Sequence, residues 1–146
     1  MSKTIVLATD HAGFELKEHV KNFLQNKGYN IKDFGALEYD SLDNYPDFII
    51  PAAKHIAEHN LIGIIFGGSG QGEAMAANRT KGIRAAVFYN GPSEIVELSR
   101  MHNNANILSI GARFLSNQET ESIIELWLST DFEEGRHEKR INKLDS

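Results

Sequence analysis

Short, nearly continuous runs of apolar residues alternate along this chain with longer stretches in which apolar residues recur every three or four positions. The short runs are rich in β-branched residues, which is typical of strands buried on both faces of a parallel sheet. The longer stretches place polar residues between the apolar ones, which indicates helices with one buried face. The pattern therefore predicts strands and helices in regular alternation.

We expect about five strands and five helices. The first strand covers Thr4 to Thr9, and the helix after it runs from Phe14 to Lys27, where Gly28 provides a C-cap. The other strands are predicted at Tyr29 to Phe34, around Ile64 to Phe66, at Ile83 to Phe88 and at Asn106 to Ile110. The other helices are predicted at Pro46 to His59, Glu73 to Asn78, Pro92 to Met101 and after a capping box of Ser116 and Glu119.

This alternation predicts an α/β fold, a three-layer α/β/α sandwich around a parallel sheet of five strands in the order 2-1-3-4-5, followed by a C-terminal helical tail. The length of 146 residues suits one domain, predicted to span residues 1–146. Ligands of such sheets bind outside the carboxyl ends of the strands, where the strand order reverses. We therefore expect the functional site between the first and third strands.

A glycine-rich loop follows the third predicted strand. Gly67, Gly68, Gly70 and Gly72 precede Glu73, at the start of a predicted helix. Such a loop brings backbone N–H groups and the positive end of a helix dipole close to an anion. Glu73 is a carboxylate in a place where an anion site would normally exclude one, which suggests proton transfer beside a developing oxyanion. The simpler alternatives are a tight turn, and an ordinary first-turn acid that complements the helix dipole.

Three standard motifs nearly fit this loop, and each fails at one residue. A dinucleotide fingerprint needs a small residue at position 73, a phosphate loop needs Lys there, and a nucleophile elbow needs glycine where the chain has Gln71. The loop is therefore neither ATP-like nor hydrolase-like.

Asp10 and His11 follow the first predicted strand, so we expect them to face the glycine loop. An acid, an imidazole, a base and an anion cradle would then meet at two adjacent strand ends. Taken singly, Asp10 could cap the next helix and His11 could be structural.

Three further groups are candidates. In the tail, Arg136 and Arg140 lie four residues apart, so one helical face could present both to a phosphate; a solvated charged tail is the alternative. Arg113 follows the last predicted strand and is a third arginine that could bind the phosphate. His102 and Asn103 lie between a helix and a strand, at the sheet edge opposite the glycine loop; either a partner subunit uses them, or they form a helix C-cap.

Composition narrows the function classes. The formal net charge of -5 argues against a general nucleic-acid surface, so an anionic ligand needs a local cluster of arginines. The absence of cysteine removes disulfides, thiolate metal sites and a cysteine nucleophile. No apolar stretch approaches the roughly 20 residues that span a bilayer, so we expect no membrane partner and a cytoplasmic location.

Together these residues resemble ribose-5-phosphate isomerase B, a sugar-phosphate isomerase family that also includes galactose-6-phosphate isomerase subunits. The resemblance covers essentially the whole chain and rests on an ordered set of motifs: D-H-A-G at 10–13, G-G-S-G-Q-G-E at 67–73, A-A-N-R at 76–79, G-I-R-A at 82–85, H-N-N-A-N at 102–106 and G-R-H-E-K-R at 135–140. It implies a Rossmann-like sandwich, no metal or cofactor, and aldose–ketose isomerisation of ribose 5-phosphate and ribulose 5-phosphate in the pentose phosphate pathway.

The resemblance also implies roles for single residues. Many relatives have a cysteine base at position 67, whereas this chain resembles the subgroup whose base is Glu73. Asp10 and His102 would help to open the sugar ring, and Ser69 and Asn103 would hold hydroxyl groups. The other expected contacts are Tyr45 in the pocket, Gly68, Gly70 and Gly72 at the substrate, and His11, Arg113, Arg136 and Arg140 at the phosphate. The backbone N–H groups around Ser69 to Gly72 would be the donors to the oxyanion. The implied assembly is a homodimer with shared active sites, possibly a dimer of dimers.

Two alternatives remain at this point. Within the family, galactose-6-phosphate isomerase subunits share the sandwich but are expected to depart at the His-Asn and tail Arg positions, and six-carbon substrates such as allose 6-phosphate could be side activities. Outside enzymes, a nucleotide-binding flavodoxin-like module would also use a glycine loop, although Glu73 would repel its phosphates.

Overall fold

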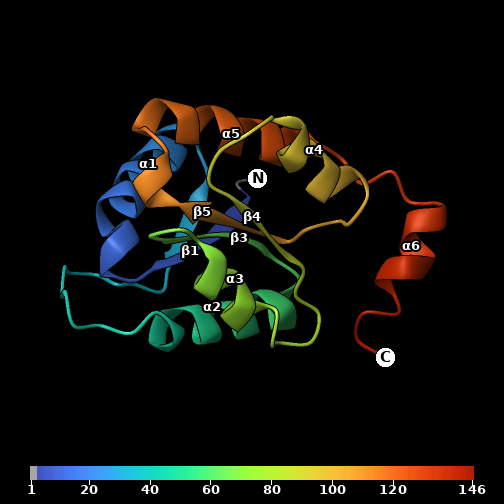
Figure 1. Cartoon of the computed structure of the whole chain (residues 1–146), viewed down its shortest axis with the longest axis horizontal. Helices are drawn as coiled ribbons and strands as arrows, with labels where there is room; N and C mark the ends of the chain where they lie inside the picture. The colour runs from blue at the N-terminus through green and yellow to red at the C-terminus, as the bar shows by residue number, and fades with distance from the viewer. Residues whose placement is uncertain (1–2) are drawn as a thin grey trace.

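The computed structural model describes residues 3–146 and has five parallel strands at its centre (Figure 1). The domain predicted for residues 1–146 includes two residues, 1 and 2, outside the described range. The strands are β1 (Thr4–Thr9), β2 (Asn30–Asp33), β3 (Ile62–Gly67), β4 (Ala85–Phe88) and β5 (Ile107–Gly111). The α/β sandwich predicted from the apolar pattern is thereby confirmed.

The helices lie within a few residues of the predicted ranges. They are α1 (Phe14–Asn26), α2 (Pro46–His59), α3 (Gln71–Ala77), α4 (Glu94–Met101), α5 (Asn117–Ser129) and α6 (Arg136–Ile141), with two short 3-10 turns, η1 (His11–Gly13) and η2 (Ala112–Phe114). The predicted capping box at the start of α5 is present, because Ser116 and Glu119 each accept from the other's backbone N–H. Among residues 3–146, no helix combines the length and apolar character needed to cross a membrane.

The predicted strand order is wrong at its last two positions. The observed order is β2-β1-β3-β5-β4, so β5 rather than β4 pairs with β3. All five residues of β5 are buried, which suits a strand covered on both faces, whereas three of the four residues of β4 are only partly buried, which suits an edge. This order sets the segment after β5, including Arg113, beside the carboxyl end of β3.

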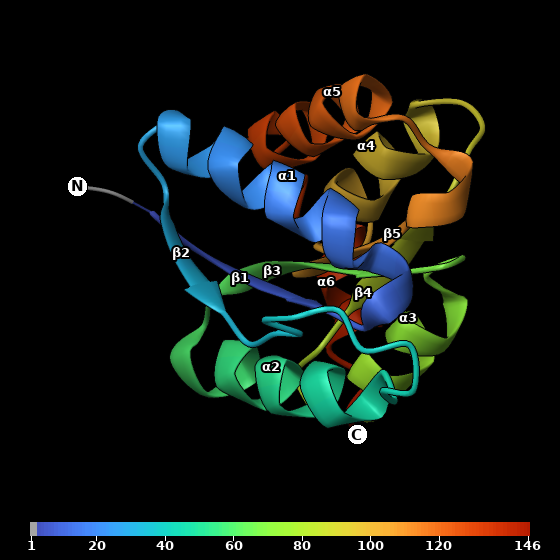
Figure 2. The same ribbon diagram turned by 90° about the vertical axis from the view of Figure 1, so that its left-hand side faces the viewer.

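Two hydrophobic cores lie on the two faces of the sheet. Helices α1, α4 and α5 cover one face and α2 and α3 the other (Figure 2). Trp127 of α5 is the largest fully buried side chain on the first face. The site predicted between β1 and β3 therefore sits on a framework packed from both sides, with β1 and β3 paired from Ile5 and Ile62 to Thr9 and Phe66.

A buried lysine ties α1 to the chain that leaves β2. Lys17 is completely buried, and its Nζ lies 2.9 Å and 2.8 Å from the two carboxylate oxygens of Asp33 and donates to the carbonyl of Ala36 at 2.7 Å. These contacts anchor the start of the long loop of residues 34–45, which carries Asp43 and Tyr45 to the carboxyl edge of the sheet.

The tail is helical, as predicted, and His137 is the buried residue of its helix. His137 of α6 is 6% exposed, whereas Leu144 is 64% exposed. Helix α6 stands at the end of the molecule opposite the start of α1 (Figure 1).

Candidate active site

Glu73 occupies the first turn of α3, and its side chain is buried, with the residue 5% exposed. The carboxyl group fills the space beside Gly67, where a Cβ atom at residue 67 would overlap all three carboxyl atoms. Burial raises the pKa of Glu73; the charge of Asp10 raises it further, whereas the amide of Glu73 itself and Arg113 lower it. A buried carboxyl with a raised pKa is suited to proton transfer, unlike a solvated acid that only complements a helix dipole.

The loop in front of Glu73 is shaped to accept an anion. Gly70 has φ of 80°, a left-handed conformation that glycine adopts without strain, and its carbonyl accepts from the buried hydroxyl of Ser109 at 2.6 Å. Ser69 Oγ accepts from the amide of Gln71 at 3.3 Å. Within residues 3–146, the amides of Ser69 and Gly70 have no hydrogen-bond acceptor, so both donors are free for a ligand oxygen.

Two side chains cover this loop. A Cβ atom at Gly72 would come within 2.9 Å of the Tyr45 hydroxyl, and one at Gly68 would come within 2.9 Å of the Arg113 guanidinium. The amide of Arg113 also donates to the carbonyl of Gly68 at 3.1 Å. The glycines thus let an aromatic hydroxyl and a guanidinium approach the backbone next to Glu73.

Asp10 and His11 lie at the end of β1, where the sequence predicted them. Asp10 Oδ1 accepts from the amide of Ala12 at 3.0 Å, so Asp10 does cap the turn that follows, while its charge also acts on Glu73. His11 Nδ1 lies 2.7 Å from Oδ1 of Asp43. Sequence reasoning missed Asp43, because it lies in an irregular loop 32 residues from its partner and no local pattern marks it.

His102, Asn103, Arg136 and Arg140 do not reach this group within the same chain. His102 caps the end of α4 and Asn103 follows it, both before the amino end of β5, whereas the glycine loop follows the carboxyl end of the parallel strand β3. Arg136 and Arg140 are exposed on α6, at the far end of the molecule (Figure 1). The structure therefore divides the predicted site residues between two opposite edges.

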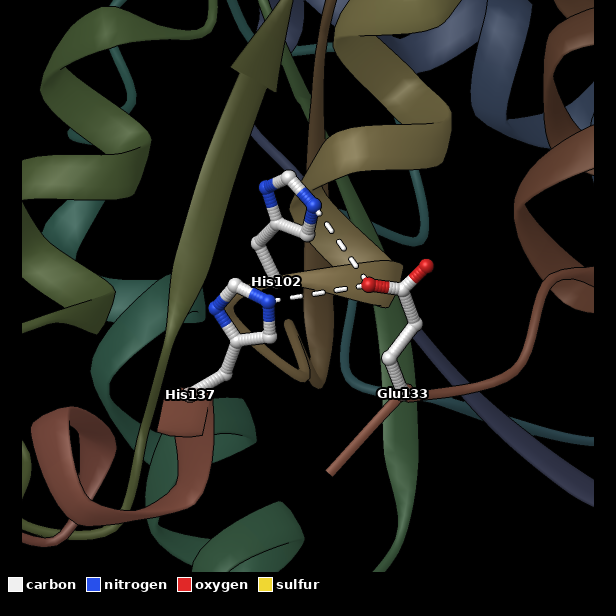
Figure 3. A group of neighbouring side chains, drawn as sticks. All are labelled: His102, Glu133 and His137. Carbon is white, nitrogen blue, oxygen red and sulfur yellow. Dashed lines mark ion pairs between the residues drawn. The ribbon is translucent and has the colours of Figure 1, made fainter. Parts of the chain in front are cut away.

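His102 belongs to a cluster at the second edge (Figure 3). Its ring stacks on that of His137, with centroids 4.3 Å apart and an interplanar angle of 14°. Oε1 of Glu133 lies 3.5 Å from Nε2 of His102 and 3.6 Å from Nε2 of His137, and the Glu133 amide donates to the carbonyl of Met101 at 3.0 Å. Burial lowers the pKa of His137. Glu133 and His137 were not predicted as site residues, since spacing in the sequence does not reveal their contact with α4.

Two groups bring potential metal-ligand atoms close together, and neither has suitable geometry as it stands. In the cluster of His102, Glu133 and His137, a metal would have to lie in the plane of each ring, but the two planes are nearly parallel. In the group of Asp10, His11 and Asp43, the 2.7 Å contact is a hydrogen-bond distance, shorter than the about 3.3 Å between tetrahedral ligands of zinc.

Comparisons with known proteins agree on one family. The sequence profile of the Ribose/Galactose Isomerase family matches residues 5–144. A probable ribose-5-phosphate isomerase B of Mycoplasma genitalium is 37% identical over 146 residues, covering 99% of this chain and 95% of that protein. Ribose-5-phosphate isomerase B of Mycobacterium tuberculosis is 39% identical over 142 residues, covering 96% of this chain and 86% of that protein.

Solved structures agree with the fold. The crystal structure of ribose-5-phosphate isomerase B from Mycoplasma genitalium, with bound ribulose-5-phosphate, matches with a TM-score of 0.92 at 37% identity, covering 99% of this chain and 95% of the other. The isomerase B structure from Thermotoga maritima matches with a TM-score of 0.92 at 42% identity and covers 99% of both chains.

Proposed function

The chain belongs to the ribose/galactose isomerase family, and on this basis we propose that it interconverts D-ribose 5-phosphate and D-ribulose 5-phosphate. The observation that carries this proposal is the buried carboxyl of Glu73 beside a glycine loop with free amides. Aldose–ketose isomerisation needs a base that removes the C2 proton and returns a proton to C1, together with fixed donors for the enediolate oxygens. Glu73 and the glycine loop supply these two requirements side by side.

Glu73 is the proposed base. The family resemblance implies a cysteine base at position 67 in many relatives, and in this chain the Glu73 carboxyl fills the space that a side chain at residue 67 would occupy. A base attached at either position would therefore present its reactive atom to the same region. The amides of Ser69 and Gly70 are the proposed oxyanion donors.

The surrounding groups suit a sugar phosphate. Arg113 and His11 are the cationic candidates on the carboxyl edge and would bind the phosphate, while Tyr45 would contact the sugar over Gly72. Asp10, next to Glu73, would act with His102 in opening the furanose ring. Ser69 and Asn103 would hold sugar hydroxyl groups.

The second half of the site is proposed to come from another copy of the chain. His102, Asn103, Arg136 and Arg140 lie at the opposite edge from Glu73 and cannot reach a substrate bound there in the same chain. A two-fold symmetric dimer would bring the amino edge of one subunit to the carboxyl edge of the other and build two complete sites. A homodimer, or a dimer of such dimers, is the assembly that we propose.

The test is an assay of ribose 5-phosphate conversion to ribulose 5-phosphate, with chelator present, for the wild type and Glu73→Gln. We expect metal-independent activity that falls by at least about a thousandfold in the variant, while calorimetric binding of the sugar phosphate changes little, because the amide keeps the shape but cannot accept the C2 proton. Glu94→Gln, an exposed first-turn glutamate of α4, is the matched control and should retain full activity. Normal turnover in Glu73→Gln would exclude this base, and a wild type inactive on ribose 5-phosphate would exclude the proposed substrate.

A further inference from the structure

A single carboxylate oxygen of Asp43 contacts both the backbone amide and the ring of His11. Oδ1 of Asp43 accepts from the His11 backbone amide at 3.0 Å and lies 2.7 Å from the ring Nδ1. The Asp43 side chain is 8% exposed and that of His11 is 27% exposed. This contact joins the loop of residues 34–45 to the end of β1, so its geometry depends on the tertiary fold and not on local sequence.

In the described part of the chain, the second carboxylate oxygen of Asp43 has no partner of its own, so His11 alone compensates the charge of Asp43. Within residues 3–146, the buried Oδ2 atom has no hydrogen-bond partner, and His11 is the only side chain that forms an ion pair with Asp43. A buried carboxylate without a cationic partner is costly, so a positive charge on the imidazole stabilises the pair as a unit.

The hydrogen bond at Nδ1 determines what the other ring nitrogen can do. A carboxylate at 2.7 Å requires a proton on Nδ1, so Nε2 of a neutral His11 would carry only a lone pair. A lone pair repels a phosphate oxygen. Only the imidazolium form has an Nε2–H group that can donate to a phosphate.

The charges that face His11 favour that form. The hydrogen bond that the His11 ring donates to Asp43 raises the pKa of His11; burial lowers it, the charges of Asp10 and Asp43 raise it, and Arg113 lowers it, with a net increase. The ring of Tyr39 contacts His11 edge-on, with centroids 6.1 Å apart, and carries no charge at neutral pH. Two acids and one guanidinium therefore surround the imidazole.

We propose that Asp43 is a positioning residue that holds His11 as an imidazolium, with its Nε2–H group directed at the phosphate of the substrate. The proposal deepens the isomerase function proposed above and rests on it. Asp43 itself does not touch the substrate; it acts only through His11. Since a dianionic phosphate arriving at His11 and Arg113 further stabilises both cations, binding and protonation reinforce each other.

The test is Asp43→Asn, which keeps an acceptor oxygen for the backbone amide but removes the charge. We expect KM for ribose 5-phosphate to rise about tenfold, as for loss of one charge-assisted hydrogen bond, with kcat within about twofold. The pH above which KM rises should move to lower pH, because the imidazolium is lost earlier. Asp40→Asn, an exposed aspartate on the same loop whose Oδ1 accepts from the Leu42 amide, is the matched control and should leave KM and its pH profile unchanged.

An NMR titration of the His11 ring provides a second readout that is independent of turnover. In the wild type, the midpoint of the His11 titration should lie above the ordinary histidine value and rise further when inorganic phosphate is added; in Asp43→Asn the midpoint should fall. In a His11→Asn background, adding Asp43→Asn should change KM no further, since Asp43 would have lost the group through which it acts.

Several outcomes would overturn the proposal. A wild-type His11 that titrates at or below the ordinary histidine value excludes an imidazolium stabilised by Asp43, whatever happens to the variants. An unchanged KM, or a loss of kcat without a change in KM, excludes a role at the phosphate. If the wild type does not isomerise ribose 5-phosphate, the proposed function fails, and the NMR titrations with inorganic phosphate still decide the pairing of Asp43 with His11.

Discussion

Residues 67 and 73 share one small volume at the carboxyl end of β3. Gly67 has no side chain, and the carboxyl of Glu73 uses the space that this leaves. The position of the proposed base therefore depends on the absence of a methyl group six residues earlier. A substitution at Gly67 should therefore impair catalysis with little effect on folding.

We predict that Gly67→Ala lowers kcat at least about a hundredfold, because the new Cβ displaces the carboxyl by the ångström or so that abolishes productive proton transfer. The contrast is Gly68→Ala, whose Cβ would meet the movable end of Arg113 and should mainly raise KM. Steady-state kinetics on both variants, with thermal unfolding to confirm folding, would check this. Similar kcat losses in the two variants would contradict the assignment.

The raised pKa of Glu73 also makes a prediction about stability. Because its pKa is higher in the folded state than in the unfolded chain, deprotonation of Glu73 costs the folded state free energy as pH rises through the folded-state pKa. Glu73→Gln should therefore be more stable than the wild type at neutral pH, and this advantage should disappear in acid below the pKa of an unfolded glutamate. Urea unfolding across this pH range measures the difference. A variant less stable than the wild type at pH 7 would count against a raised pKa of Glu73 in the folded state.

At the scale of elements, a buried charge on α1 holds this helix to the chain that leaves β2. Lys17 Nζ contacts Asp33 and the Ala36 carbonyl while wholly buried, and it fixes the start of the loop that carries Asp43 and Tyr45. Burial alone would raise the pKa of Asp33, but hydrogen bonds from Lys17, the Gly35 amide and Lys21 lower it. The pair therefore stabilises the fold above the unfolded pKa of Asp33, and this contribution is lost as pH falls through the folded-state value.

Lys17→Met should cost about 3 to 5 kcal/mol of the free energy of unfolding, because it leaves a buried carboxylate without its main partner. Lys21→Met is the control: Lys21 contacts the same carboxylate at 3.1 Å from a partly exposed position, and its loss should cost roughly 1 kcal/mol or less. Chemical denaturation near pH 7 gives both values. Equal losses of unfolding free energy in the two variants would mean that Lys17 is not the main residue that holds α1 to the end of β2.

At the scale of the molecule, sequence reasoning predicts features set by neighbouring residues and misses contacts between residues far apart in the chain. The strands and helices were predictable because apolar spacing is a local property, and the capping box at Ser116 lies within four residues. The exchange of β4 and β5 was not, because which strand pairs with β3 depends on relative burial across the whole sheet. Asp43 was missed for the same reason, since it meets His11 only through tertiary packing. The contact of Glu133 with His102 was also missed, although Glu133 lies only four residues from His137, its other partner.

The division of the proposed site between subunits can be tested by complementation. Glu73→Gln and His102→Ala should each be inactive alone, but co-expressed with different tags they should recover about a quarter of wild-type activity, because half of randomly paired dimers are mixed and each mixed dimer has one intact site. Pairing Glu73→Gln with Arg113→Ala is the control: both changes affect the same half, so no site is intact. Recovery in the control, or none in the first pair, would exclude shared sites.

The volume shared by residues 67 and 73 also has an evolutionary consequence. The family resemblance implies a cysteine base at position 67 in many relatives, and a side chain there would overlap the Glu73 carboxyl in its observed position. A lineage that changes from one to the other by single substitutions must pass through a protein with both groups, which overlap, or with neither, which has no base. Each step is therefore harmful until the other has occurred, and natural selection should keep the two lineages apart.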